Sequence, residues 1–277
     1  MTDTRTSEAW AAYEKAAAAS RVSIRELGGI GDLRQAEAVL AGIWGPETPP
    51  LTAELMRALG KAESYVAGAY DGSEMVGVCV GFHSTPAARA MHSHIAGVVP
   101  AMAGRHAGFA LKLHQRAWCL DHGIDLMEWT YDPLVARNAY FNLAKLGARV
   151  AEYLPDFYGP MTDRINREDQ SDRILVHWRL ASREVAAACA GEPVRATASP
   201  GDVWVEVPRD VEALRVADPV QARGWRTKVR EQLVTALDAG EEIAGFAKDR
   251  GYLLTGRAAE ATPGGGVGST TREEGRP

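Results

Sequence analysis

The stretch MHSHIAGVVPAMAGRHAGFALKLHQRA, residues 91–117, decides the fold that we expect for this chain. Its pattern predicts a strand over 92–99, a turn at Pro100, a loop that contains glycine, and a helix from about Gly104. A loop that leads into a helix presents backbone N–H groups that have no partner inside the helix. Such a terminus is suited to an anion, so the stretch predicts an anion site between a strand and a helix.

The composition is that of a globular protein with a slight acidic surplus. The 277 residues are 46% hydrophobic, and the formal net charge is −5, whereas nucleic-acid binders usually carry a basic surplus. No apolar run approaches the ~20 residues of a membrane helix, and MTDTRTSEAW at the start lacks the basic-then-apolar order of a signal peptide. Three cysteines are too few and too scattered for a disulfide framework or a thiolate zinc site. We therefore expect a cytoplasmic protein without nucleic-acid or membrane partners.

The hydrophobic periodicity predicts a mixed α/β fold, with a mostly antiparallel central sheet, flanking helices and a small C-terminal α+β extension. We expect the main domain at 22–181, after an N-terminal helix with a frayed end at 1–21. The extension would span 182–256 and pack on the main domain, and the glycine-rich tail at 257–277 would be disordered. Expected strands are 22–27, 65–70, 75–82, 92–99, 126–130, 148–153, 173–180 and 203–207, with a hairpin at 242–255. Expected helices are 7–19, 32–44, 52–61, 104–122, 134–146, 182–190 and 218–239.

The motif V-V-P-x-x-x-G-R-x-x-G-x-A-L-K, in this order of elements, resembles the coenzyme A loop of the GNAT superfamily of N-acyltransferases. A second run, WTYDPLVARNAYFNLAKLG at 129–147, is more specific. Together with MHSH at 91–94, it resembles a bacterial subgroup found near N-acylamino acid racemases. The likeness spans about residues 22–255. It implies a GNAT-like fold and a CoA thioester, acetyl-CoA or succinyl-CoA, as acyl donor.

Three positions depart from the family pattern. The leading polar residue of the loop is Ala103, its middle glycine is His106, and the tyrosine that usually protonates the departing thiolate is Leu143. Glycine lets backbone amides approach a phosphate closely, so His106 either crowds a pyrophosphate or adds a cation to it. The alternative is a strand–helix turn that keeps the motif and binds nothing. The resemblance implies donor contacts from Val98, Val99, Gly104, Arg105, His106, Ala107 and Gly108.

The chemistry of acyl transfer to an amine needs a base, and His94 lies on the strand before the loop, about where the family places one. An ordinary histidine pKa near ~6.5 suits this role. His92 lies two residues earlier and therefore on the same face, where we expect it to contact the substrate. The alternatives are structural histidines, or a metal site for which no third ligand is evident.

The departing thiolate needs an acid, for which Tyr140 and Tyr158 are the two candidates because Leu143 occupies the usual position. Either phenol is also a packing residue in the alternative interpretation.

Three further polar residues are candidates for substrate binding. Pro133 keeps Asp132 out of helical geometry and leaves its carboxylate free for a substrate or for capping the next helix. Asn138 has the same two options. Arg173 pairs with an acidic substrate or, within the fold, with Asp172 or Asp163.

Four other cations lie on predicted helices. Arg137 and Lys145 are expected on a solvated face, whereas Arg226 and Arg230 lie one helical turn apart. The latter pair either recognises a carboxylate, stabilises a dimer or is simply exposed.

The sequence thus predicts a CoA-thioester-dependent N-acyltransferase acting on the amine of a small molecule such as an amino acid, with a homodimer as one possible assembly. Two alternatives stay open because the loop and the acid are altered. One is a GNAT-fold enzyme whose chemistry needs no CoA. The other is a non-catalytic binding protein that uses the C-terminal extension as a docking surface.

Overall fold

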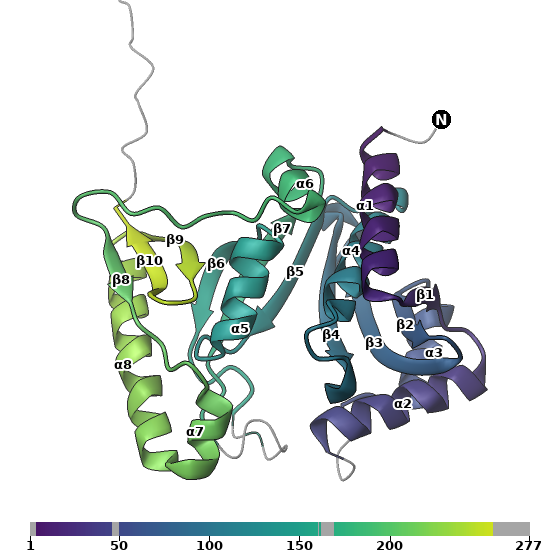
Figure 1. Cartoon of the computed structure of the whole chain (residues 1–277), viewed down its shortest axis with the longest axis horizontal. Helices are drawn as coiled ribbons and strands as arrows, with labels where there is room; N and C mark the ends of the chain where they lie inside the picture. Colours follow the sequence, from purple (N-terminus) through teal and green to yellow (C-terminus); the bar gives the residue numbers. More distant parts are fainter. Residues whose placement is uncertain (1–3, 46–49, 160, 162–168, 257–277) are drawn as a thin grey trace, which may run out of the picture.

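The computed structural model describes residues 4–45, 50–159, 161 and 169–256. Its main sheet has seven strands in the order β1-β2-β3-β4-β5-β7-β6 (Figure 1), and every neighbouring pair is antiparallel except β4 and β5. The predicted mixed α/β class with a mostly antiparallel sheet is therefore confirmed. The strands are β1 (Ser23–Glu26), β2 (Tyr65–Asp71), β3 (Glu74–His83), β4 (Ala90–Val98), β5 (Leu126–Tyr131), β6 (Arg149–Leu154) and β7 (Arg173–Arg179).

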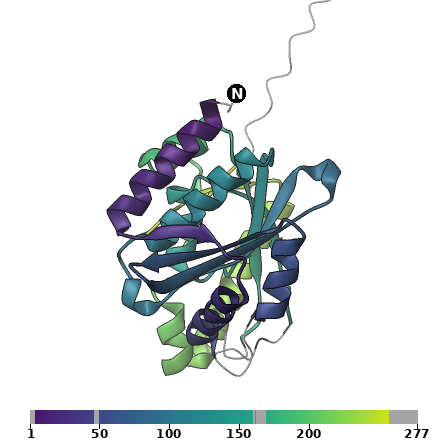
Figure 2. The same cartoon turned by 90° about the vertical axis from the view of Figure 1, so that its right-hand side faces the viewer.

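Helices cover both faces of this sheet and divide its core in two. Helices α1 (Thr4–Ser20) and α4 (Ala107–Asp121) pack together on one face, whereas α2 (Ile30–Trp44) and α3 (Ala53–Lys61) cover the other (Figure 2). Successive side chains of each strand point to opposite faces of the sheet, so one half of them packs toward α4 and the other half toward α2. Thr52, the first residue of the helix expected at 52–61, caps α3 by accepting a hydrogen bond from the backbone N–H of Leu55 at 3.3 Å.

Strands β4 and β5 pair over three residues and then diverge (Figure 1). The register joins Ala90 to Leu126, Met91 to Met127 and His92 to Glu128, whereas β4 stays paired with β3 as far as Val98. A bulge lies at His94, because the register steps from Gly81–Ser93 to Val80–Ile95. The second half of β4 thus has a free backbone edge, and it leads directly into the loop before α4.

The C-terminal unit, residues 182–256, contains a second sheet of three strands in the order β8-β10-β9. Strand β9 packs against β6 and the π-helix η3 (Tyr140–Lys145). The predicted disorder of 257–277 lies outside the described residues. The unit consists of α6 (Arg183–Ala190), β8 (Val203–Val205), α7 (Val211–Ala217), α8 (Pro219–Asp238), β9 (Glu242–Ala247) and β10 (Gly251–Thr255).

A buried ion-pair network fastens this unit to the main sheet. The guanidinium groups of Arg215 and Arg226 both contact the carboxylates of Asp132 and Asp169, and all four side chains are less than 10% exposed. Buried charges persist only when they are paired in this way. Arg226 is therefore a buried link between two parts of the chain, which excludes the exposed-face interpretation of that residue.

Two helices differ from the predicted ones near the site. The expected helix at 104–122 begins later, at Ala107, because a 3-10 turn, η2 (Pro100–Met102), and a left-handed His106 precede it. The expected helix at 134–146 is a short α5 (Ala136–Ala139) followed by η3. The switch to π geometry is visible in the hydrogen bond from the Leu146 N–H to the Phe141 carbonyl, five residues back.

Helix α7 was not predicted from the sequence, although Asp210 caps it by accepting from the Ala213 N–H at 2.9 Å. In the part of the chain that the structure describes, no helix combines the length and the apolar character needed to cross a bilayer.

Candidate active site

The loop between β4 and α4 holds a set of unpaired backbone N–H groups. Those of Gly104, His106, Ala107 and Gly108 donate no hydrogen bond to any residue that the structure describes. Gly104 and His106 both have positive φ, at 78° and 62°, which turns successive amides of the loop into a concave arrangement. Together with the N-terminus of α4, these N–H groups form a site suited to an anion.

His106 has a left-handed backbone conformation at the start of α4. Its φ of 62° and ψ of 16° lie in the left-handed region, which is unfavourable for residues with a Cβ. Its Nδ1 lies 3.4 Å from the Nζ of Lys145. An ammonium group can only donate, so the Nδ1 of His106 is the acceptor in this contact. The cation at this position is therefore Lys145, which the sequence had suggested to be a solvated surface group.

Two of the predicted donor contacts have partners within the fold. The Arg105 guanidinium donates to the Asp71 carboxylate at 2.6 Å, and the Arg105 N–H donates to the Met102 carbonyl. The Val99 N–H donates to the Val76 carbonyl at 2.9 Å. The Val99 N–H is therefore not available to an anion. The Arg105 guanidinium is only partly occupied, and its donor contact stays a prediction. Because N–H groups alternate along a strand, the Val98 N–H points away from β3, toward the divergence of β4 and β5.

A row of polar side chains crosses β4, β5 and β7 on the face opposite α4. His92 and Glu128 are register partners, and so are Glu128 and His177, whose Nε2 lies 3.8 Å from the Glu128 carboxylate. His94 extends this row along β4. The ring of Phe82 lies 5.1 Å from that of His92 and 5.6 Å from that of His94, centroid to centroid. The structure thus brings the two predicted histidines together on one face.

Burial lowers the pKa of both histidines below the ordinary value of 6.5. For His92, the charge of His94 lowers the pKa further and Glu128 opposes the shift. Both imidazoles are therefore neutral at pH 7 and able to accept a proton. His94 is the more exposed of the two, so it is the better placed to meet a substrate amine.

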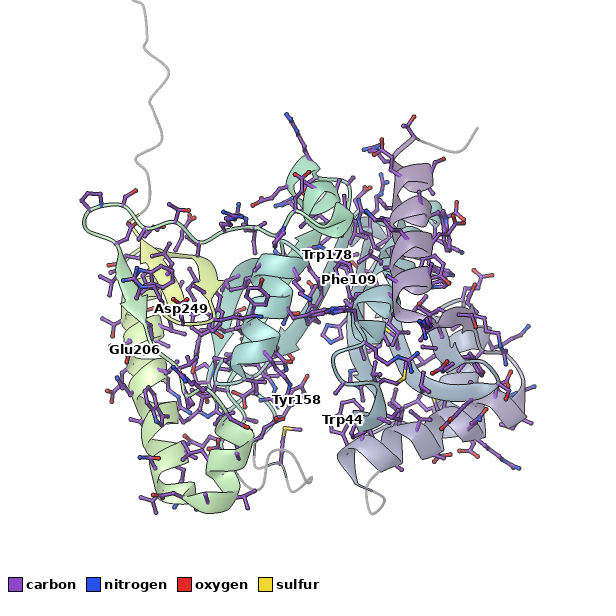
Figure 3. All side chains as sticks on the ribbon, in the orientation of Figure 1. Trp44, Phe109, Tyr158, Trp178, Glu206 and Asp249 are labelled. Carbon is purple, nitrogen blue, oxygen red and sulfur yellow. The ribbon has the colours of Figure 1, made fainter. Side chains whose placement is uncertain are left out.

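The two predicted tyrosines lie in different surroundings. The Tyr158 hydroxyl is 3.3 Å from the Thr130 hydroxyl on β5, and its ring is 47% exposed. Figure 3 shows Tyr158 on the β5 side of the divergence and Trp44 on the β4 side. Tyr140 instead begins η3, and the Nζ of Lys248 lies 4.3 Å from the centroid of its ring. Tyr158 is thus the phenol that shares the sheet face with the histidines.

Arg173 lies on this face of β7, beneath Tyr158, with its Cζ 5.3 Å from the centroid of the phenol ring. Its guanidinium donates to the backbone carbonyl of Asp172 at 2.8 Å and contacts the Met161 sulfur. The Asp172 carboxylate pairs with Arg230 instead, so the expected ion pair between Arg173 and Asp172 is wrong. Asp163 lies outside the described residues, and within the described ones the Arg173 guanidinium contacts no carboxylate.

Asp132 does not point to a substrate. Oδ1 accepts from Arg226 at 2.7 Å and from the Leu134 N–H at 2.9 Å, and Oδ2 accepts from Arg215 at 2.5 Å. Burial alone would raise the pKa of this carboxyl, but the charges of the two guanidinium groups hold it well below its usual range. Its predicted substrate role is therefore corrected to a structural one. Asn138 is half-buried in α5, and its side chain makes no hydrogen bond to a described residue.

Lys112 lies on the α4 side, away from the histidines. Its Nζ donates to Ser93 and Gln115 at 2.9 Å each and lies 3.9 Å from the centroid of the Trp129 ring. Burial lowers its pKa to about 8. This lysine belongs to the core beneath β4.

Sequence reasoning missed Glu128, Thr130 and His177 as members of the polar face. The alternation of polar and apolar residues along β5 and β7 was the available signal. No three His, Cys, Asp or Glu side chains gather as metal ligands within the described parts of the chain.

Comparison with known proteins identifies a likeness in architecture only. No family model matches the chain, and no curated protein matches it either. Solved acetyltransferases do match. The ribosomal-protein-S18-alanine N-acetyltransferase from Escherichia coli has a TM-score of 0.48 at 14% identity, over 58% of this chain and 95% of that one. An acetyltransferase of the GNAT family from Streptococcus pneumoniae has a TM-score of 0.48 at 14% identity, over 56% and 97% of the two chains.

A third structure is yncA, a putative acetyltransferase from Salmonella typhimurium solved with acetyl-CoA, at a TM-score of 0.47 and 16% identity. The matched region covers 58% of this chain and 94% of the yncA chain. These similarities are too low to assign an activity, and the racemase-associated subgroup stays a prediction.

Proposed function

We propose that this chain transfers the acyl group of a CoA thioester to the amine of a small molecule. One observation carries the proposal. The part of β4 that has no partner in β5 contains a neutral histidine, His94, and leads into a loop whose backbone N–H groups at 104 and 106–108 are unpaired. The anion site suits the phosphate groups of a CoA thioester, and the base suits the amine that attacks it. This combination favours a CoA substrate over chemistry without CoA and over a purely structural role.

The bond changes follow from the groups around the divergence. His94 takes a proton from the amine nitrogen, which attacks the thioester carbonyl carbon and forms a C–N bond. The Val98 N–H, directed away from β3, stabilises the oxyanion of the tetrahedral intermediate. The C–S bond then breaks, and the thiolate takes a proton from the Tyr158 hydroxyl, leaving an amide and a free thiol.

The acceptor that fits this face best is an amine that also carries a carboxylate, such as an amino acid. Arg173 is the cation beneath Tyr158, and within the described residues no carboxylate occupies its guanidinium. His92 and Thr130 add polar contacts on the same face. A carboxylate on Arg173 would hold the substrate amine on the His94 side of the sheet.

The test combines binding with product analysis. Isothermal titration with acetyl-CoA and succinyl-CoA measures donor binding, and mass spectrometry detects N-acylated products from a panel of amino acids and their decarboxylated amines. We expect one thioester to bind in the micromolar range and amino acids to be acylated faster than the matching amines. Absence of binding of both thioesters at millimolar concentration would contradict the proposal.

A further inference from the structure

The C-terminal unit brings a second lysine to the loop. Lys248 begins the turn between β9 and β10, and β9 packs on η3. Its Nζ lies over the ring of Tyr140 at one end of η3, whereas Lys145 at the other end contacts His106 of the loop. The two lysines therefore lie at the two ends of the same short π-helix, and the one at 145 contacts the loop before α4.

The two ammonium groups are close enough to influence each other, and neither is neutralised. The pKa of Lys145 is lowered by burial and then by the charge of Lys248. Within the described residues, neither lysine forms an ion pair with a carboxylate.

The acid next to Lys248 does not neutralise it either. Asp249 and Glu206, both labelled in Figure 3, line a hollow of about 220 Å³ together with Trp204. Two like charges, one of them at the loop with the unpaired N–H groups, create a positive potential that attracts an anion.

We propose that Lys248 of the C-terminal unit, together with Lys145, binds the phosphate groups of the acyl donor. This inference rests on the proposed function and adds a residue to its donor site that lies outside the loop motif. The C-terminal unit then completes the donor site, and the enzyme discriminates phosphorylated thioesters from unphosphorylated ones through these two lysines.

The test compares three probes. ADP carries a pyrophosphate and no thioester, S-acetylpantetheine carries a thioester and no phosphate, and acetyl-CoA carries both. In Lys248→Ala and Lys145→Ala, we expect the Kd of ADP and of acetyl-CoA to rise about 5- to 10-fold, as for loss of a charged contact to phosphate. The kcat/KM for S-acetylpantetheine should not change. Added salt should weaken acetyl-CoA binding less in both variants than in the wild type.

Two controls separate charge from structure. Lys248→Arg keeps the positive charge and should retain wild-type affinity for ADP. Lys228→Ala removes an exposed lysine of the same unit, whose Nζ lies over the Trp225 ring, and should leave all three probes unaffected.

Each contrary result has a distinct meaning. Wild-type affinity for ADP in both alanine variants would overturn the role of the lysines and leave the proposed function standing. An equal loss with S-acetylpantetheine would mean that the substitutions disturb the fold, which also overturns the inference. A wild-type protein that binds ADP but no CoA thioester would overturn the proposed function alone.

Discussion

The indole of Trp44 lies so close to Gly97 that a Cβ added at position 97 would be 2.5 Å from the ring carbon Cη2. Trp44 ends α2, and Gly97 lies on the part of β4 that has no partner in β5. The tryptophan therefore packs against β4 at the point where β4 is no longer paired with β5. A glycine is needed at 97 for as long as this ring packs there.

Gly97→Ala should destabilise the protein by about 1–3 kcal/mol, because real Cβ atoms do not approach ring carbons this closely and the indole must move. In a Trp44→Ala background, the same substitution should have little effect. Urea unfolding of the four variants gives the coupling energy. Gly42→Ala, in α2 with open space around its Cα, is the matched control and should stabilise slightly. Equal losses in both backgrounds would contradict the contact.

His94→Ala should lower kcat/KM for the amine by about 100-fold or more, in line with the loss of a general base. The base must be unprotonated, and burial places the pKa of His94 below 6.5. Wild-type kcat/KM should thus fall as the pH drops through a value below 6.5, and this acidic limb should disappear in the variant. His122→Ala, which removes a ring stacked on Trp118, should change neither. A larger loss in His92→Ala than in His94→Ala would move the base role to His92.

His106→Gly should be more stable than His106→Ala by about 1 kcal/mol, since only glycine relieves the left-handed conformation at φ 62°. Both variants remove the imidazole and its contact with Lys145, so the difference in their stability measures the cost of the left-handed backbone conformation alone. Thermal unfolding measures it. If the two variants unfold at the same temperature, position 106 is not left-handed in solution.

Lys112→Met should stabilise the protein at pH 7 by up to about 3 kcal/mol, since one pKa unit corresponds to about 1.4 kcal/mol. Burial lowers the pKa of Lys112 from 10.5 to about 8 in the folded state. Between these values, only the unfolded chain holds the proton, so wild-type stability should rise with pH from about 8 to 10.5. Chemical unfolding of both proteins across this range measures the effect. A difference between them that does not change with pH would contradict the burial of a charged lysine.

The sequence was sufficient to predict features that depend on residues close together along the chain. Alternating apolar residues located the strands, and Thr52 marked a helix start through its own side chain. Unpaired N–H groups between β4 and α4 were also predictable, because a helix N-terminus leaves its first amides unpaired whatever lies around it.

The sequence was not sufficient to predict the contacts of a charged side chain whose partner is distant in the sequence. Lys145 was expected on a solvated face, yet it meets His106. Arg226 was expected to recognise a carboxylate, stabilise a dimer or be exposed, yet it lies buried against Asp132. Arg105 matches the motif in type and position, but its guanidinium is held by Asp71, 34 residues earlier. Helical periodicity indicates which side of a helix is polar, and it does not reveal which charges the fold will bring there.

The pairing of Asp132 with Arg226 also sets an order of assembly. The two residues are 94 positions apart, so all seven strands of the main sheet have been synthesised before Arg226. An unpaired carboxylate resists dehydration, so Asp132 keeps its water until Arg215 of α7 and Arg226 of α8 reach it. The carboxylate of Asp132 therefore loses its water only when the C-terminal unit packs against the main sheet, so the two parts share one core.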